Sequence, residues 1–169
     1  MSTTYGQLAR KTPYSVEAEQ SVLGCIVISG TVATELCGKL QETDFYSPVH
    51  QTIFNAMKDL NLKNQPIDYV TLVSELERKQ KLNEVGGINY ITSLTNVVPT
   101  AANYEHYQQI VQEDSKLRKL IAMAEKIAEM GYKSETSNSI VEYTEKALTD
   151  LVTSASSGLV HISEAVNAV

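Results

Sequence analysis

Histidine and cysteine have the widest chemical range in this sequence, because both can bind metals and act in catalysis near neutral pH. The three histidines are His50, His106 and His161, and no two of them have the i,i+4 spacing of a helical metal site. Cys25 and Cys37 have no histidine nearby and match no zinc pattern. We expect no metal site and two buried, reduced thiols. His50 should contact Asp44 or the backbone in the first turn of one helix, and His106 should lie in the first turn of another.

Glycine-rich phosphate loops and nucleophile motifs are the next sites to consider. The nucleotide-binding pattern G-x-x-x-x-G-K-[ST] fails at both ends, because Gly38-Lys39 is followed by Leu40 and preceded by Ala33 instead of glycine. Gly86-Gly87 fits a break before a helix. The motifs G-x-S-x-G and H-E-x-x-H are absent. The sequence therefore offers no catalytic, cofactor-binding or metal-binding residues.

The charge of the chain argues against a strong nucleic-acid binder. Its net charge is -6 and its isoelectric point is near 5.1. The densest basic segment, Lys116-Leu-Arg118-Lys119, shares its expected helix with five carboxylates, Glu105, Glu113, Asp114, Glu125 and Glu129. Tight nucleic-acid binding usually needs a clustered basic face. No signal-peptide pattern or bilayer-length apolar stretch is present, so we expect a cytoplasmic protein without membrane contact.

Apolar residues at helical spacing predict five short helices in residues 13–100, after a flexible arm at residues 1–12. Ser15 is the expected N-cap of the first helix and Gly30 its end. The second covers residues 32–40, and the third follows Pro48. Asp68 should cap the fourth, and the fifth follows Gly86-Gly87 and ends before Pro99. These residues should form a small globular helical head.

Two long amphipathic helices are expected in residues 101–155. The first runs from about Asn103 to Met130 with Gly131 at its C′ position, and Ser137 caps the second. A short polar turn between them predicts an antiparallel helical hairpin. Residues 156–169 fit a linker and the start of a linker helix. The fold class is therefore all-α. The hairpin has more apolar surface than one partner helix covers, which points to a second copy or another protein.

Six motifs occur in an order that resembles the N-terminal part of bacterial replicative helicases of the DnaB family. They are Pro13-Tyr-Ser-Val-Glu17-Ala-Glu19-Gln20-Ser-Val-Leu23-Gly24, Asp44-Phe45-Tyr46 with His50-Gln-Thr-Ile53-Phe54, Pro66-Ile-Asp68-Tyr-Val-Thr71-Leu72, Gly86-Gly87-Ile-Asn-Tyr90-Ile91, Pro99-Thr-Ala-Ala-Asn103, and Tyr107-Gln-Gln-Ile110-Val111 leading to Leu117-Arg118. The family's RecA-like ATPase motor, with its phosphate loop, is missing here. ATP and Mg²⁺ belong to that motor, so the resemblance implies a domain that is not itself an enzyme and needs no cofactor.

The resemblance implies a collar domain that docks other proteins. In this family the hairpins pair head to head, three pairs form a collar on a hexameric ring, and the collar receives the helicase-binding domain of primase and, in some systems, loader proteins. It assigns the primase-facing role to Glu17, Tyr90, Arg118, Ile121 and Ile127.

Each assignment has a structural alternative. Glu17 could be a first-turn residue favoured by the helix dipole, and Tyr90 could belong to the head core. Arg118 could pair with Asp114 on its own helix, while Ile121 and Ile127 could serve hairpin packing or dimerisation. A different function also stays open: a stand-alone regulator, or decoy, of the same fold that binds a helicase ring or a primase.

Overall fold

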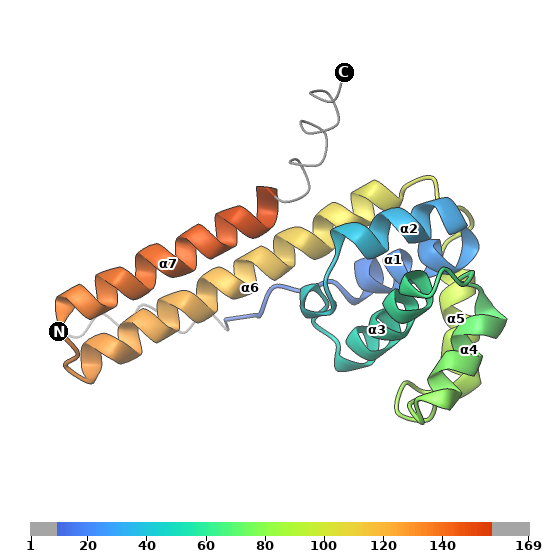
Figure 1. The fold of residues 1–169 in the computed structure, drawn as a ribbon, viewed down its shortest axis with the longest axis horizontal. Coiled ribbons are helices and arrows are strands. Elements are labelled where there is room, and N and C mark those ends of the chain that lie inside the picture. The colour runs from blue at the N-terminus through green and yellow to red at the C-terminus, as the bar shows by residue number, and fades with distance from the viewer. Residues whose placement is uncertain (1–9, 157–169) are drawn as a thin grey trace, which may run out of the picture.

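A computed structural model describes residues 10–156, and this part of the chain is helical without strands. Five helices of the head are α1 (Val16–Ile28), α2 (Gly30–Lys39), α3 (Pro48–Leu62), α4 (Tyr69–Arg78) and α5 (Gly87–Val97), with a 3-10 turn η1 (Glu42–Asp44) between α2 and α3. Two longer helices follow, α6 (Tyr104–Tyr132) and α7 (Ser137–Ser156). They run antiparallel and project from the head (Figure 1). The all-α prediction, with a head followed by a hairpin, is confirmed.

Serine side chains begin the first two helices. The Oγ atom of Ser15 accepts a hydrogen bond from the Ala18 N–H at 3.2 Å, as predicted for an N-cap. Ser29 ends α1 with its own N–H, which donates to the Cys25 carbonyl, and starts α2 with its Oγ, which accepts from Val32. The prediction that Gly30 ends the first helix is wrong. Gly30 is the first residue of α2, because extended Ser29 caps both helices.

Local caps also set the starts of α3, α4 and α5. Pro48 occupies the first turn of α3, where its missing N–H costs no helical bond. Asp68 and Thr71 exchange side-chain to backbone hydrogen bonds in a capping box at the start of α4. Gly86 precedes α5 with φ 92°, a left-handed conformation that glycine adopts without strain. The predicted break at Gly86-Gly87 is therefore confirmed.

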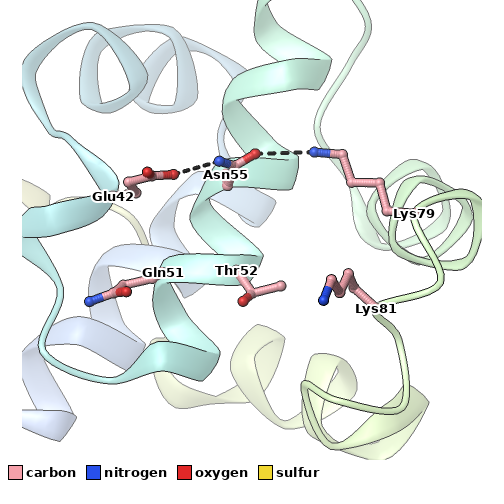
Figure 2. A pocket seen from close by; sticks show the side chains of 6 residues that line it. All are labelled: Glu42, Gln51, Thr52, Asn55, Lys79 and Lys81. Atoms are coloured by element: carbon pink, nitrogen blue, oxygen red, sulfur yellow. Dashed lines mark hydrogen bonds between the residues drawn. The ribbon is translucent and has the colours of Figure 1, made fainter.

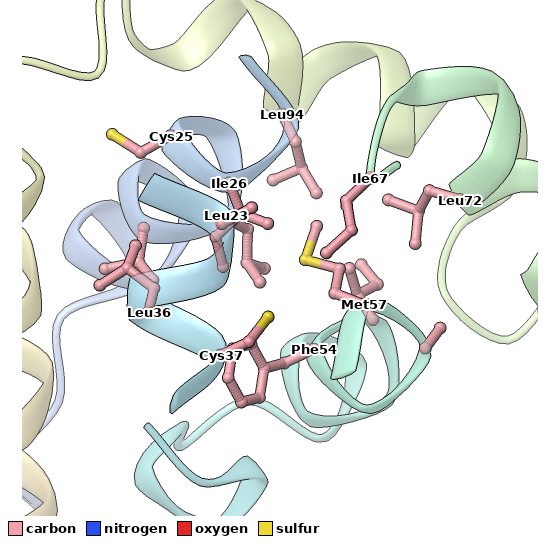
Figure 3. Packing of buried hydrophobic residues seen from close by; sticks show 14 of the residues in the cluster. Leu23, Cys25, Ile26, Leu36, Cys37, Phe54, Met57, Ile67, Leu72 and Leu94 are labelled. Carbon is pink, nitrogen blue, oxygen red and sulfur yellow. The ribbon is translucent and has the colours of Figure 1, made fainter. Parts of the chain in front are cut away.

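The core of the head lies between α1, α2 and α3 and extends to α4 and α5 (Figure 3). Phe45 and Phe54 pack with ring centroids 4.8 Å apart and are almost fully buried. Gly24 lets α1 approach α5 closely: a β-carbon built there would lie 2.6 Å from the Leu94 carbonyl oxygen. Cys25 and Cys37 are buried and free, and burial raises the pKa of each thiol to about 11. The predicted burial of both thiols is confirmed.

Helix α6 belongs to both parts of the molecule. Its first half packs on α1, where Val111 and Ser115 are buried, and its second half pairs with α7. The predicted C′ role of Gly131 is wrong, because α6 continues to Tyr132. Ser134 adopts the left-handed conformation instead (φ 58°), and Glu135 N–H donates back to the Met130 carbonyl.

Thr136, and not Ser137, caps α7. Its Oγ1 accepts from the Ser139 N–H, and its carbonyl accepts from the Ile140 N–H. The predicted arm at residues 1–12 and linker at 156–169 fall largely outside the described residues, and so does His161. Within the described range, no helix has the length and hydropathy needed to cross a bilayer.

Candidate functional site

Among residues 10–156, no three or more His, Cys, Asp or Glu side chains are grouped in a way that could hold a metal ion. A hollow of about 480 Å³ beside α3 is lined by polar side chains (Figure 2). Its lysines already have partners: Lys79 bonds Asn55 and Asp59, and Lys81 bonds Glu84. A second hollow, of about 720 Å³, lies where α2, α6 and the end of α7 meet, and it is lined mainly by glutamine, lysine and carboxylate side chains. Neither hollow presents a catalytic arrangement.

The most ordered polar cluster lies where α1, α3 and α5 meet. His50 Nδ1 is 2.5 Å from Glu19 Oε2, and His50 Nε2 is 2.6 Å from the Tyr90 hydroxyl. The side chains of Glu19 and His50 are only 3% and 1% exposed. The prediction that His50 contacts Asp44 or the backbone is wrong, because the α3 register aims its ring at Glu19 and Tyr90. We call Glu19, His50 and Tyr90 the relay.

Glu19 is held in place by the loop before α3. Tyr46 N–H donates to Oε1 at 2.5 Å, and Ser47 N–H donates to Oε2 at 3.3 Å. These two backbone donors and His50 give the buried carboxylate three partners, which offsets the cost of removing it from water. The relay therefore fixes the loop, α1 and α3 relative to one another.

Gln20 links two of the predicted docking residues, Glu17 on its own helix and Tyr90 on α5. Tyr90 is half-buried, and its hydroxyl oxygen accepts a hydrogen bond from Gln20 Nε2 at 3.2 Å. Glu17 is exposed and lies three residues before Gln20 on α1, so the two are neighbours on the helix surface. Glu17 and Tyr90 thus share one surface at the start of α1.

Arg118 occupies the junction between the head and the hairpin. Its guanidinium donates to the carbonyls of Pro13 and Asp44, at 2.8 and 2.7 Å, and lies 5.7 Å from the ring centroid of Tyr46. Tyr46 in turn stacks on Tyr14 at 4.2 Å. Arg118 bonds these carbonyls and not Asp114, the partner that the alternative interpretation gave it.

Asp44 supports the same junction from the head side. Its carboxylate caps η1 by accepting from the Gln41 N–H, and it also accepts from Ser115 Oγ at 2.7 Å and Lys119 Nζ at 3.2 Å. Ser115, Arg118 and Lys119 all lie on α6. The junction therefore ties one face of α6 to the loop that also supports the relay.

The hairpin has two apolar faces. Partly or fully buried residues recur every three or four positions and face the other helix: Leu120, Met123, Ile127 and Met130 on α6, and Ile140, Thr144, Ala147 and Leu151 on α7. Several residues that directly follow such positions are exposed and apolar, namely Ile121 on α6 and Val141, Leu148 and Val152 on α7, with Leu117 one turn before Ile121.

These exposed residues lie on one side of the hairpin. In an antiparallel helix pair, positions displaced by one residue in the same sense from the contact line lie on the same side of the pair. We call this set (Leu117, Ile121, Val141, Leu148 and Val152) the apolar face. Ile121 belongs to it and is 45% exposed, whereas Ile127 lies in the contact between α6 and α7. The two isoleucines therefore have different surroundings.

Sequence patterns did not reveal Glu19, Gln20 or His50 as parts of the site. The contacts of His50 join residues 31 and 40 positions apart, and the Tyr90–Gln20 bond spans 70 positions. The one local signal was the polarity of Glu19 and His50 on otherwise apolar helix faces.

Known proteins resemble this chain in sequence. The model of the DnaB-like helicase N terminal domain matches residues 11–113. A replicative DNA helicase, DnaC of Bacillus subtilis, is 48% identical over 126 residues, which are 75% of this chain and 28% of the relative. The replicative DNA helicase DnaB of Geobacillus stearothermophilus is 43% identical, with the same shares covered. This chain thus spans little more than a quarter of the length of these curated relatives.

Solved structures share the fold. The N-terminal domain of DnaB helicase from Mycobacterium tuberculosis superposes with a TM-score of 0.77 at 34% identity, covering 83% of this chain and 99% of that one. A DnaB-like replicative helicase, described together with its interactions with primase, superposes with a TM-score of 0.63 at 27% identity, covering 92% of this chain and 35% of that one.

Proposed function

The chain belongs to the family of DnaB-like helicase N-terminal domains, and on this premise we propose that it is a non-catalytic collar domain. In this proposal it joins the subunits of a hexameric replicative helicase and docks the helicase-binding domain of primase at the replication fork in the bacterial cytoplasm. It acts by bringing primase to the fork at high local concentration. Its net charge of -6 fits protein contacts better than tight binding to a phosphate backbone.

The apolar face of the hairpin is the observation that carries the proposal. Ile121, Leu148 and Val152 are 45%, 45% and 65% exposed, and they line one side of two paired helices. Contiguous apolar surface of this kind is commonly an interface. A second copy related by a two-fold axis would bury the face against itself, as symmetric dimers do. Self-association through the hairpin is therefore the first element of the proposed function.

Primase docking is the second element. One structural relative is described with its interactions with primase. In this chain, Glu17 and Tyr90 share a surface at the start of α1, and Arg118 lies beside the loop that supports the same relay. We propose Glu17 and Tyr90 as direct contacts. Arg118 acts by holding Pro13, the loop before α3 and α6 together.

The two isoleucines then have separate roles. Ile121 takes part in association through the apolar face, whereas Ile127 supports docking indirectly by fixing α6 on α7. This division gives each of the five predicted docking residues a role that a single substitution can examine.

Self-association is tested by sedimentation analysis of the Ile121→Asp and Leu148→Asp variants. We expect the unaltered chain to form dimers and both variants to sediment as monomers with unchanged circular dichroism, because a charge in an apolar interface is not compensated. Val70→Asp is the matched control: Val70 is 67% exposed but lies on α4, so its replacement should leave the dimer intact. Dimers that persist in both hairpin variants would refute the role of the apolar face.

Docking is tested by calorimetric titration with the helicase-binding domain of the cognate primase. We expect saturable binding that is weakened by Tyr90→Ala and by Glu17→Lys. Glu77→Lys makes the same charge change on an exposed position of α4 and should leave binding unchanged. Equal weakening by all three variants would show that the effect is one of net charge or stability, and it would move the docking site elsewhere.

A further inference from the structure

The chemistry of the three relay side chains fixes which group donates and which accepts at each hydrogen bond. We propose that Glu19 and His50 hold the hydroxyl proton of Tyr90 inward, so that this hydroxyl offers a partner only an acceptor lone pair and selects a cationic hydrogen-bond donor on the docked primase domain. Glu19 and His50 are thus positioning residues that act through Tyr90. The inference deepens the proposed function and rests on it.

The direction begins at Glu19. An ionised carboxylate only accepts hydrogen bonds, and the Glu19 oxygens already accept from the backbone N–H groups of Tyr46 and Ser47. The third partner, His50 Nδ1 at 2.5 Å, must therefore donate, which places the imidazole hydrogen on Nδ1.

His50 passes this direction on to Tyr90. A neutral imidazole with its hydrogen on Nδ1 has a lone pair on Nε2, and Nε2 lies 2.6 Å from the Tyr90 hydroxyl. With the imidazole neutral, the hydroxyl donates across this contact, whereas an imidazolium would donate from Nε2 and reverse it. Its oxygen then accepts from other groups, in agreement with the Gln20 amide nitrogen, which approaches it at 3.2 Å.

Burial keeps the relay in this arrangement. The side chains of His50 and Glu19 are 1% and 3% exposed, so water does not offer them alternative partners. Tyr90, the third member of the relay, is only half-buried.

The charge beside Tyr90 decides which donor fits. Glu17 is exposed and lies one helical turn from Gln20, whose amide bonds the Tyr90 hydroxyl, so a carboxylate lies near the acceptor oxygen of that hydroxyl. A lysine or arginine of the partner satisfies both at once, because each donates and carries positive charge. A carboxylate at the same position would meet an acceptor and a like charge.

Nitrogen NMR of the His50 ring tests the relay in the unaltered chain. Long-range ¹H–¹⁵N correlations distinguish a protonated from an unprotonated ring nitrogen, and a His50 variant assigns the signals among the three histidines. We expect a protonated Nδ1 and an unprotonated Nε2. A protonated Nε2 would overturn the inference without any bearing on whether the domain docks primase.

Two His50 variants test the link to docking. In His50→Asn the amide nitrogen can still reach Glu19 but no acceptor faces Tyr90, whereas the longer amide of His50→Gln can provide one. We expect the Kd for the primase domain to rise roughly 3- to 10-fold in the Asn variant, the size of one hydrogen bond, and to recover in the Gln variant. Circular dichroism and thermal melting of each variant check that it is folded.

A double-mutant cycle separates positioning from stability. In the Tyr90→Phe background, His50→Asn should produce no further rise in Kd, because the hydroxyl it orients is gone. An equal rise in both backgrounds would overturn the positioning role. Absence of binding by the unaltered chain would refute the proposed function together with the selection of a donor, while the NMR result would still decide the orientation of the relay.

Discussion

Replacing Gly24 with alanine tests the closest helix contact in the head. The new β-carbon would lie 2.6 Å from the Leu94 carbonyl oxygen and 3.2 Å from Val98 Cγ2. Real β-carbons essentially never come closer than 3.0 Å to such atoms. Because the distance to the Leu94 oxygen would be 2.6 Å, α1 and α5 must separate by at least 0.4 Å. The obstacle is backbone, which cannot move aside by changing a rotamer.

The cost follows from two opposing effects. Overpacking in a well-packed core costs about 1–3 kcal/mol. Alanine is also favoured over glycine in a helix by about 1 kcal/mol. Gly38 on α2 isolates the second effect, because a β-carbon there has nothing within 4 Å. We therefore expect Gly24→Ala to be less stable than Gly38→Ala by about 1–3 kcal/mol.

Urea unfolding followed by circular dichroism measures this difference. The Gly38→Ala variant should match or exceed the stability of the unaltered protein. The Gly24→Ala variant should have a lower unfolding midpoint and an unchanged slope. Equal stability of the two variants would show that α1 and α5 do not approach as closely as described, and it would remove the packing argument for Gly24.

Three further predictions concern charge, thiols and the junction. Hydrogen bonds and charge from Arg78 and Lys63 lower the pKa of buried Glu75 from 4.5 to about 2. The stability that the ionised Glu75 contributes is therefore present above about pH 4.5 and is lost as the pH falls towards 2. Glu75→Gln should flatten the acid side of a curve of unfolding free energy against pH. Cys25 and Cys37, with pKa values raised to about 11 by burial, should react with a thiol reagent only at the rate at which the head opens, and reaction at the rate of a free thiol would contradict their burial. Arg118→Lys cannot bond both carbonyls in the same fork geometry, so stability should fall by about 1–2 kcal/mol and proteolysis near Pro13 should accelerate.

The starts of α1 and α4 were predictable from the sequence because capping is local, whereas the caps of α2 and α7 fell one to three residues from their predicted places. Ser15 and Asp68 each bond a backbone N–H three residues later, within the window that a sequence pattern covers. Helix ends were less predictable. Glycine is one of several ways to end a helix, and this chain uses Ser29 in an extended conformation and Ser134 in a left-handed one, where the sequence suggested Gly30 and Gly131.

The candidate site was predictable only through resemblance. Resemblance placed Glu17 and Tyr90 in one role, and the structure brings them to one surface; their contact with primase stays a prediction. The relay could not be found from the sequence, because His50 meets Glu19 and Tyr90 through the packing of three helices, and no short pattern encodes that packing. Resemblance also gave Ile121 and Ile127 the same role, although a difference of six residues places them on different faces of α6.

Helix α6 has a mechanical consequence. It is one unbroken helix of 29 residues, tied to the head at Ser115 and Arg118 and paired with α7 beyond them. From Ser115 to Tyr132 it extends roughly 26 Å. A rotation of the head by about 5° would therefore shift the tip of the hairpin by roughly 2 Å, because a continuous helix works as a lever arm. A small rotation of the head would therefore cause a larger displacement at the tip of the hairpin and of any protein bound there.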